Sequence, residues 1–278
     1  MPLLTHRKIG DMDVDIIRDG GIEFPEDVFP SLTSDQIAFL LAQTGASSLE
    51  TSFNCVLIRR SDHIILVDAG CRDVMGESAG KLPETLDELG VKPSDIDKVI
   101  ITHLHPDHIS GALTADGQPV FFNAEMLLTE AERNYWANDA NFAGADESGH
   151  AWRSAALNAL DAYGDRVTLL DQDATVAGGI MLVPLPGHTP GHTGLMIEQG
   201  GSSLFYGSDV FVAQGIQLAD ATICTAFDID QDQAISTRMK TMDMLATERM
   251  LMSSAHMLAP GLGYLERVSD GFAITQEA

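Results

Sequence analysis

Short apolar runs rich in β-branched residues recur along the chain, separated by turns that contain Gly, Pro or Asp. Residues 54–59 and 63–67 form two such runs, and the three polar residues between them predict a hairpin. A third run, 98–102, leads directly into a histidine-rich segment. In the second half of the chain the same pattern predicts strands at 167–170, 180–185, 193–197 and 203–206.

Segments with helical character lie between these runs. The sequence predicts helices at 127–137, at 151–162 and at 83–89, the last with Pro83 in its first turn and Gly90 just past its end. A further helix is predicted over 230–252. The face that we expect to pack on a sheet consists of Ile235, Met239, Met242 and Leu245. Strands separated by helices predict a layered α/β fold.

Composition narrows the class of protein. With 278 residues, 45% of them apolar, the chain can bury one large core, and we expect a single domain over residues 1–278. The net charge of −25 opposes binding to nucleic acid or to an anionic membrane. No apolar run approaches the roughly 18 residues of a membrane span, and no signal peptide is visible, so we expect a cytoplasmic protein. Three cysteines without a C-x-x-C pair do not form a disulfide framework.

The segment Thr102-His-Leu-His-Pro-Asp-His108 carries the clearest chemistry. Alternate residues of an extended segment share a face, so His103 and His105 can hold one metal ion. Asp107 and His108 follow as the chain turns, and they can reach a second ion. The alternative is a histidine-rich surface loop, which we consider improbable for a cluster with this spacing.

Two metal ions need more ligands than one loop supplies. Three further polar residues follow apolar runs in the same way: His188 in the turn 186–192, Asp209 after the run 203–206, and His256 after Ser253-Ser254-Ala255. His192 lies in the same turn as His188, and we interpret it as supporting or structural.

The order His103-x-His105-x-Asp107-His108, His188, Asp209 and His256 resembles the complete ligand set of the metallo-β-lactamase superfamily. Asp68, in Leu66-Val-Asp-Ala-Gly70, is similar to an earlier turn of that family. The motif-bearing core extends from about residue 52 to 257. Stretches such as Gly80-Lys-Leu-Pro83 resemble the methyl parathion hydrolase-like branch, which includes organophosphate hydrolases, lactonases and arylesterases. The resemblance implies a four-layer αβ/βα sandwich and a homodimer.

The resemblance also implies roles for individual residues. His103, His105 and His188 would bind one ion, Asp107, His108 and His256 the other, and Asp209 would bridge them. Asp107 and Asp209 would be the catalytic carboxylates. Asp68 would support the histidine loop, and a plain turn aspartate before Gly70 is the alternative for it. Zinc is the expected metal, while iron, manganese and cobalt suit the same ligands. Two such ions can acidify a shared water and produce the nucleophile, so no serine or cysteine nucleophile is required.

A small ester or lactone is the expected substrate, with phosphotriester cleavage as a side activity. The pocket wall implied by the resemblance consists of Met75, Trp136, Trp152 and Phe227, and core packing is the alternative for each. An acyl-homoserine lactonase is the nearest alternative function. A β-lactamase, a thioesterase and a metal-dependent oxidoreductase of the same fold are weaker ones, the last because it favours Glu in place of His105.

Overall fold

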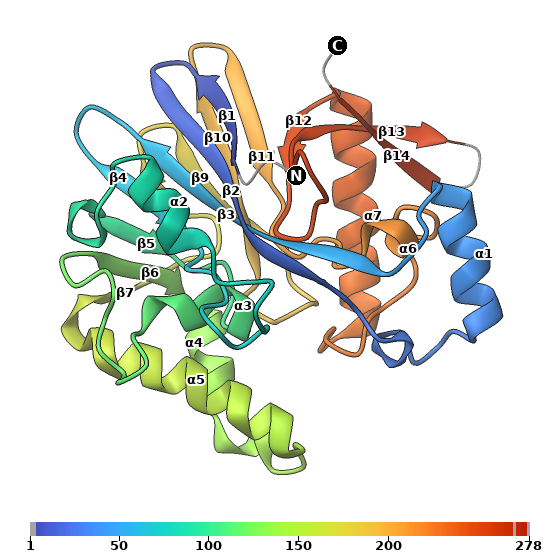
Figure 1. Ribbon diagram of the computed structural model, residues 1–278, viewed down its shortest axis with the longest axis horizontal. Coiled ribbons are helices and arrows are strands. Elements are labelled where there is room, and N and C mark those ends of the chain that lie inside the picture. The colour runs from blue at the N-terminus through green and yellow to red at the C-terminus, as the bar shows by residue number, and fades with distance from the viewer. Residues whose placement is uncertain (1–3, 269–270, 277–278) are drawn as a thin grey trace.

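Two seven-stranded sheets pack face to face in the computed structural model, with helices on their outer faces (Figure 1). The structure describes residues 4–268 and 271–276. Segments up to residue 170, coloured from blue through green to greenish yellow, form one sheet, while the later segments, coloured from yellow through orange to red, form the other. The resulting helix–sheet–sheet–helix arrangement is the four-layer sandwich that the resemblance implies.

The first sheet follows chain order, so each strand pairs with its neighbours in sequence. Its first four strands pair antiparallel, and the remaining pairs are parallel with helices in the connections. Its strands are β1 (Leu4–Ile9), β2 (Met12–Glu23), β3 (Glu50–Arg59), β4 (Ile64–Val67), β5 (Lys98–Ile100), β6 (Glu125–Thr129) and β7 (Val167–Leu170).

The second sheet also follows chain order. All its pairs are antiparallel except β11 with β12, between which the chain makes a long helical crossover. Its strands are β8 (Thr175–Ala177), β9 (Ile180–Pro184), β10 (Thr193–Gln199), β11 (Ser202–Tyr206), β12 (Leu251–Ser253), β13 (Gly263–Val268) and β14 (Gly271–Thr275).

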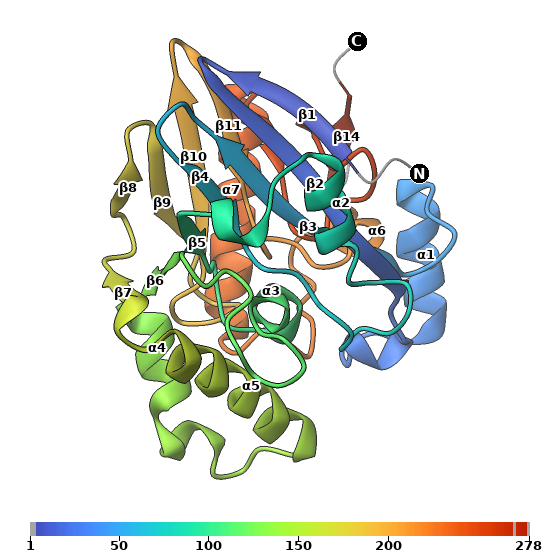
Figure 2. The same ribbon diagram turned by 60° about the vertical axis from the view of Figure 1, so that its left-hand side comes forward.

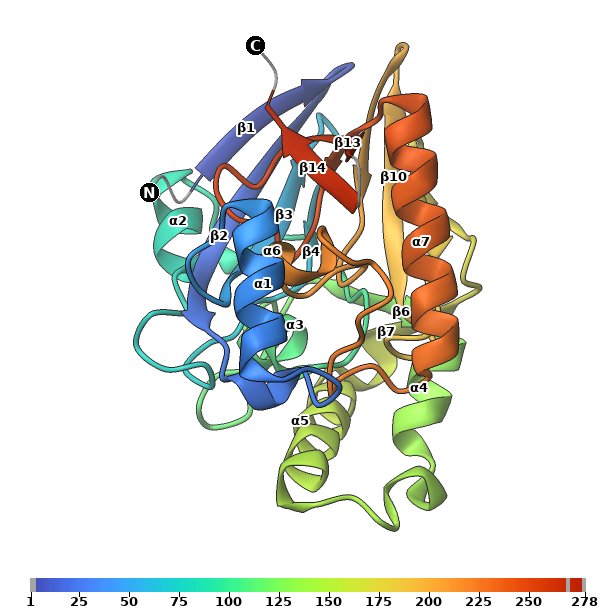
Figure 3. The same ribbon diagram turned by 90° about the vertical axis from the view of Figure 1, so that its right-hand side faces the viewer.

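Helices cover the outer faces of both sheets. Four of them pack on the first sheet or at its end: α2 (Leu82–Glu88), α3 (Pro106–Ile109), α4 (Glu130–Ala137) and α5 (Glu147–Tyr163) (Figure 2). The helix α7 (Gln231–Glu248) runs along the second sheet, and α1 (Ser34–Thr44) packs on α6 (Gln214–Gln217) beside it (Figure 3). No helix within the described residues is long and apolar enough to cross a membrane.

An apolar cluster between the sheets holds the sandwich together. It includes Val56, Ile58, Leu195, Ile197 and Leu204, all essentially without exposed surface. The alternation of inward and outward side chains along each strand supplies this layer. Burial of apolar area is the main favourable term in folding, so this shared core fixes how the strand ends of one sheet meet those of the other.

Most predicted elements are confirmed, and two need correction. Residues 125–129 form strand β6 rather than the start of a helix, because helix α4 begins only at Glu130 after the capping residue Thr129. The predicted helix 230–252 ends at Glu248, since Arg249 is left-handed and the chain turns into β12. Met239 lies outside the buried face of α7, with 47% of its surface exposed.

We expect Leu204→Ala to lower the free energy of unfolding by about 2–5 kcal/mol, because it leaves a cavity between the sheets. Met181→Ala is the matched control, since Met181 lies on β9 in the same sheet with its side chain exposed. Urea denaturation followed by circular dichroism measures both. Equal effects of the two substitutions would contradict the assignment of Leu204 to the intersheet core.

Candidate metal centre

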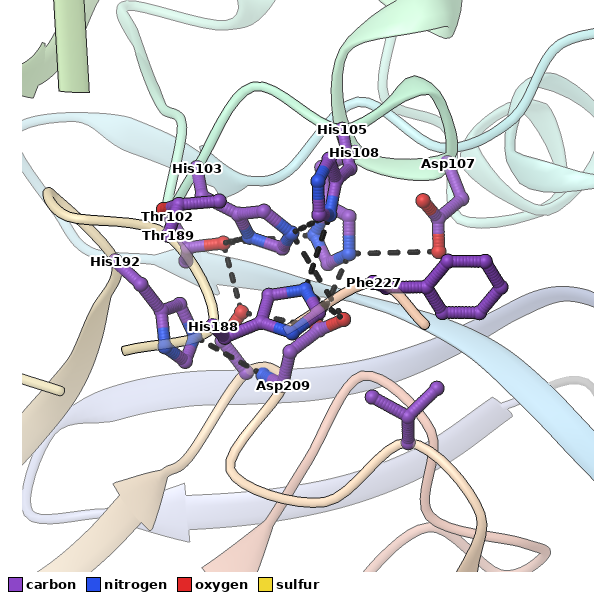
Figure 4. A network of polar contacts seen from close by, with 12 residues as sticks. Thr102, His103, His105, Asp107, His108, His188, Thr189, His192, Asp209 and Phe227 are labelled. Atoms are coloured by element: carbon purple, nitrogen blue, oxygen red, sulfur yellow. Dashed lines mark hydrogen bonds and ion pairs between the residues drawn. The ribbon is translucent and has the colours of Figure 1, made fainter. Parts of the chain in front are cut away.

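Four chain segments bring polar side chains together at one end of the sandwich (Figure 4). The first runs from β5 into α3 and carries His103, His105, Asp107 and His108. The turn between β9 and β10 carries His188, the segment after β11 carries Asp209, and the segment after β12 carries His256. The structure therefore gathers all seven residues that the resemblance implies as ligands.

The first group consists of three imidazoles. Nδ1 of His105 lies 3.0 Å from Nε2 of His103 and 3.0 Å from Nε2 of His188. The three rings are nearly perpendicular to one another, so their nitrogens meet at one point rather than stacking. Neutral imidazole offers one lone pair per ring, and three converging lone pairs form a donor set for a metal ion.

The second group consists of Asp107, His108, Asp209 and His256, whose ligand atoms lie within 4.8 Å of one another. Oδ2 of Asp107 is 3.5 Å from Nε2 of both His108 and His256. Nε2 of His108 is buried and has no hydrogen-bond partner within the described chain, although Oδ1 of Asp209 lies 3.1 Å away. A divalent ion at this point would use the otherwise unsatisfied nitrogen.

Asp209 lies between the two groups. Its Oδ2 is 3.3 Å from Nε2 of His188 on one side and 2.9 Å from Nε2 of His256 on the other. One carboxylate thus faces a histidine of each group. Bidentate carboxylates can bridge two divalent ions in this way, so the position fits the predicted bridging ligand.

Outer hydrogen bonds fix which nitrogen of His108, His188 and His256 faces inward. Nδ1–H of His188 donates to Asp228 at 2.9 Å, and Nδ1–H of His108 donates to Asp68 at 2.8 Å. Nδ1–H of His256 donates to the carbonyl oxygen of Ser52 at 2.8 Å. In each case Nε2 is left with its lone pair directed at the centre, an arrangement typical of metal-binding histidines.

Asp228 and Arg238 were not anticipated from the sequence. Arg238 is buried on α7 and donates to Asp228 and to backbone carbonyl groups, including that of Val210 next to Asp209. Burial acts to raise the pKa of Asp228, but its bonds to His188 and Arg238 hold that pKa well below the usual range. These two residues are ten positions apart, and neither belongs to a motif. The sequence therefore gives no sign that they support a metal ligand.

His192 has both ring nitrogens engaged elsewhere. Nδ1–H donates to the carbonyl oxygen of Leu185 at 2.8 Å, and Nε2 accepts the backbone N–H of Asp209 at 3.1 Å. Burial lowers its pKa to about 3, and the ring is therefore neutral. His192 holds the backbone of Asp209 in place, in agreement with a supporting position rather than a ligand.

Backbone strain is concentrated beside the centre. Asp68 and Ser208 are two of the four non-glycine residues with positive φ in the described chain, at 59° and 44°. Asp68 accepts hydrogen bonds from the backbone and hydroxyl of Thr102 as well as from His108. Ser208 immediately precedes Asp209. Conformations of this kind persist where surrounding contacts over-determine them, as at functional sites.

The electrostatics of the first group favour metal binding. Burial lowers the pKa of His105 to about 3, and the neighbouring His188 adds to the shift. Burial and the neighbouring His108 likewise hold the pKa of His103 well below its usual value. Both rings are therefore neutral at physiological pH, which is the form that binds metal ions. Imidazole and carboxylate together suit a divalent cation of the first transition row.

An apolar cavity of about 320 Å³ opens directly onto the centre. Its floor is formed by His105, Asp107, His188, Asp209 and His256. Met75, Trp152 and Phe227 line its wall, where the resemblance places the substrate pocket. Further wall residues that the sequence did not indicate come mainly from β2 and the segment after it: Ile22, Phe24, Pro25, Asp27 and Val28.

Trp136 does not line this cavity, contrary to expectation. It is buried among the core residues under the first sheet, and its Nε1–H donates to Glu132 at 2.7 Å. Its ring touches the edge of His105 from behind, with centroids 5.7 Å apart. Core packing, the alternative stated for each wall residue, therefore holds for Trp136, because a resemblance places a residue near the centre without telling which side of the ligands it occupies.

Comparison with known families decides the assignment. The protein-family model for the metallo-beta-lactamase superfamily matches residues 51–250 of the chain. The chain belongs to this superfamily. Within the superfamily match lie six of the seven gathered residues, and His256 follows just beyond it.

Individual relatives are more distant. The chain is 26% identical over 198 residues to a protein of Mycobacterium bovis named as a probable metallo-hydrolase, and 28% identical over 163 residues to an N-acyl homoserine lactonase of a Bacillus species. These alignments cover 58% and 52% of this chain and 57% of each relative, so the chain spans little more than half the length of these relatives. The solved structure of AidC, a dizinc quorum-quenching lactonase in complex with a product, superposes with a TM-score of 0.91 and 26% identity, covering 99% of this chain and 97% of that one.

We expect Asp209→Ala to reduce the metal content below two ions per chain, because both groups lose a shared carboxylate. The loss of activity should exceed the roughly 10–100-fold that removal of an outer hydrogen-bond partner costs. Metal analysis after gel filtration measures the first effect, and Asp232→Asn on the exposed side of α7 is the control. Two ions and undiminished turnover in the Asp209→Ala protein would reject a bridging position.

Proposed function

We propose that this protein is a hydrolase that uses two divalent metal ions to cleave uncharged lactones or esters. The observation that carries the proposal is the contrast between the floor and the wall of the cavity. Its floor presents two groups of metal-binding side chains, and its wall is almost entirely apolar. Among residues 4–268 and 271–276, no Lys or Arg lines it.

Charge selectivity follows from this lining. At the floor, Asp107, Asp209 and the hydroxide nucleophile would offset most of the charge of the two ions. Against the wall, an anionic substituent would lose its hydration without meeting a cationic side chain, which is costly in an apolar environment. Asp27 at the exposed rim and the net charge of −25 add repulsion. A neutral ester, lactone or phosphotriester avoids this cost. Carboxylate-bearing β-lactams do not, and this favours the ester-type hydrolase over a β-lactamase.

The chain's own residues supply positioning and proton handling. When bound, two divalent ions supply Lewis-acid polarisation of a carbonyl oxygen and acidify water. Asp107 lies at the cavity floor with 13% of its side chain exposed, whereas Asp209 is more deeply buried. An Oδ atom of Asp107 is therefore placed to orient a water molecule and accept its proton. The apolar wall excludes competing water and strengthens these interactions.

Zinc is the metal we propose for both groups. Its preference for imidazole and carboxylate ligands matches three histidines in the first group and two histidines with two carboxylates in the second. Iron, manganese and cobalt accept the same ligands, so the expressed protein would bind whichever is available.

N-acyl homoserine lactones are the second, narrower candidate substrate. An acyl chain would fit the aromatic wall, where Phe227 lies 5.8 Å from both Phe24 and Trp152 between ring centroids. The Bacillus relative is named as an N-acyl homoserine lactonase, and AidC is described with N-hexanoyl-L-homoserine as its product. The homodimer, the cytoplasmic location and the methyl parathion hydrolase-like branch stay predictions.

A substrate panel tests the proposal. We expect the zinc-loaded protein to hydrolyse γ- and δ-lactones, acyl-homoserine lactones or p-nitrophenyl acetate, with slower cleavage of a methyl phosphotriester. Turnover should stop on chelation and return with zinc. An anionic chromogenic cephalosporin should remain intact. Cephalosporin turnover that matches the lactone rates would reject the charge argument.

Phe227→Ala should raise KM roughly tenfold for substrates with a hexyl or larger apolar group, corresponding to about 1.4 kcal/mol of lost contact. We expect kcat to change little, because this contact is made in the ground state and the transition state alike. Steady-state kinetics with short and long acyl chains measure the difference. Phe39→Ala is the control, since Phe39 is 64% exposed on α1 and is not among the residues that line the cavity. An equal KM for all chain lengths would place the acyl group elsewhere.

A further inference from the structure

Glu132 is a buried carboxylate behind the metal centre that the proposed chemistry does not use. It lies in the first turn of α4 with no exposed surface. Within the described residues no Lys, Arg or His forms an ion pair with it. A buried carboxylate without a cationic partner is costly unless hydrogen bonds compensate.

Four donors surround this carboxylate, two on each oxygen. Oε1 accepts the backbone N–H of Leu104 at 2.9 Å and Nε1–H of Trp136 at 2.7 Å. Oε2 accepts Oγ1–H of Thr189 at 2.6 Å and the backbone N–H of Gly191 at 3.1 Å. Burial raises the pKa of Glu132, and these hydrogen bonds oppose the rise.

The positions of the donors connect Glu132 to the first metal-binding group. Leu104 lies between His103 and His105, and Thr189 directly follows His188. One carboxylate oxygen therefore holds each of the two segments that carry this group. The ligand nitrogen of His105 lies 3.0 Å from those of His103 and His188, so the two segments must be held close together. A backbone hydrogen bond from Thr193 to Thr102 joins them at their base, but within the described residues none joins Leu104 to the turn 186–192.

Close packing at Gly191 reinforces this link. A Cβ atom at Gly191 would lie 2.2 Å from the backbone nitrogen of Glu132, so the turn rests directly on the start of α4. Thr129, which caps α4, donates through Oγ1 to the carbonyl oxygen of Gly191 at 2.9 Å. Both the N–H and the carbonyl oxygen of Gly191 therefore bond to residues at the start of α4, and these bonds fix the turn to the helix that carries Glu132.

The second group is supported by other residues. His108 is held by Asp68, and His256 by the carbonyl oxygen of Ser52. Neither contacts Glu132. A change at Glu132 should therefore act on one group and leave the other in place.

We propose that Glu132 is the positioning residue of the first metal-binding group, holding the segment of His103 and His105 and the turn of His188 at the spacing a metal ion requires. The inference rests on the proposed metal binding and is independent of the substrate.

Glu132→Gln is the diagnostic substitution because its volume is unchanged. Leu104, Trp136 and Gly191 each present an N–H group that can only donate. The new amide NH₂ would face at least one of them in either orientation. We expect this mismatch to separate the two segments and weaken zinc binding at the first group by roughly 10–100-fold.

Two backgrounds separate the groups. His256→Ala impairs the second group and leaves the first, while His188→Ala does the reverse. Zinc affinity is measured by competition with a chromogenic chelator. In the His256→Ala protein, adding Glu132→Gln should weaken zinc binding at the first group by roughly 10–100-fold. In the His188→Ala protein, the same substitution should change zinc affinity at the second group by less than about threefold. Glu130→Gln, exposed on the same helix, should change neither.

Thr189→Val removes a single donor while retaining the side-chain volume, and it serves if Glu132→Gln fails to fold by circular dichroism. It should show the same site preference with a smaller factor. Equal weakening in both backgrounds, or none in either, overturns the positioning role. Wild-type protein that binds two zinc ions without hydrolysing the panel would reject the proposed substrate and leave this inference standing, whereas a wild-type chain that binds no zinc would overturn both.

Discussion

Lone pairs of five buried imidazoles and two carboxylates face one another at one end of the sandwich, with the ligand atoms of each group within 4.8 Å. Nothing in the apolar core attracts these groups to each other, and bringing them out of water is unfavourable without a cation. The arrangement depends on the two sheets, whose shared core fixes four strand ends at the same place. Each ligand follows one of these strand ends within a few residues. The packing of the apolar strands therefore determines where the ligands lie relative to one another.

A layer of outer contacts converts this rough placement into defined ligand orientations. Asp68, Asp228 and the carbonyl oxygen of Ser52 each accept a hydrogen bond from Nδ1–H of one imidazole. Their own positions are fixed in turn, by Thr102 in the first case and by buried Arg238 in the second. The left-handed backbone at Asp68 and Ser208 belongs to the same layer. Orientation is therefore determined by residues from both halves of the chain.

Sequence patterns predict the ligands better than their supports. His103 and His105 stand out because several metal-binding residue types occur close together after a strand. Glu132 and Asp228 do not, since a single acidic residue at the start of a helix or in a loop is usually a cap or a solvated side chain. Their importance arises from contacts with segments more than 25 residues away. The sequence predicts helix over the last three residues of strand β6 for a related reason: its apolar run continues without a break into α4, and only the cap at Thr129 separates them.

The wall of the cavity has a different origin from its floor. The floor comes from the strand ends of both sheets, whereas part of the wall, Phe24, Pro25, Asp27 and Val28, comes from the connection between β2 and α1, which precedes the region matched by the superfamily. That connection carries none of the seven ligands. Met75, Trp152 and Phe227 complete the wall from within the matched region, so recognition is encoded partly in the stretch that carries the ligands and partly in one that carries none. A lineage could exchange or lengthen residues 22–33 and acquire a new range of substrates while its hydrolytic machinery remained unchanged.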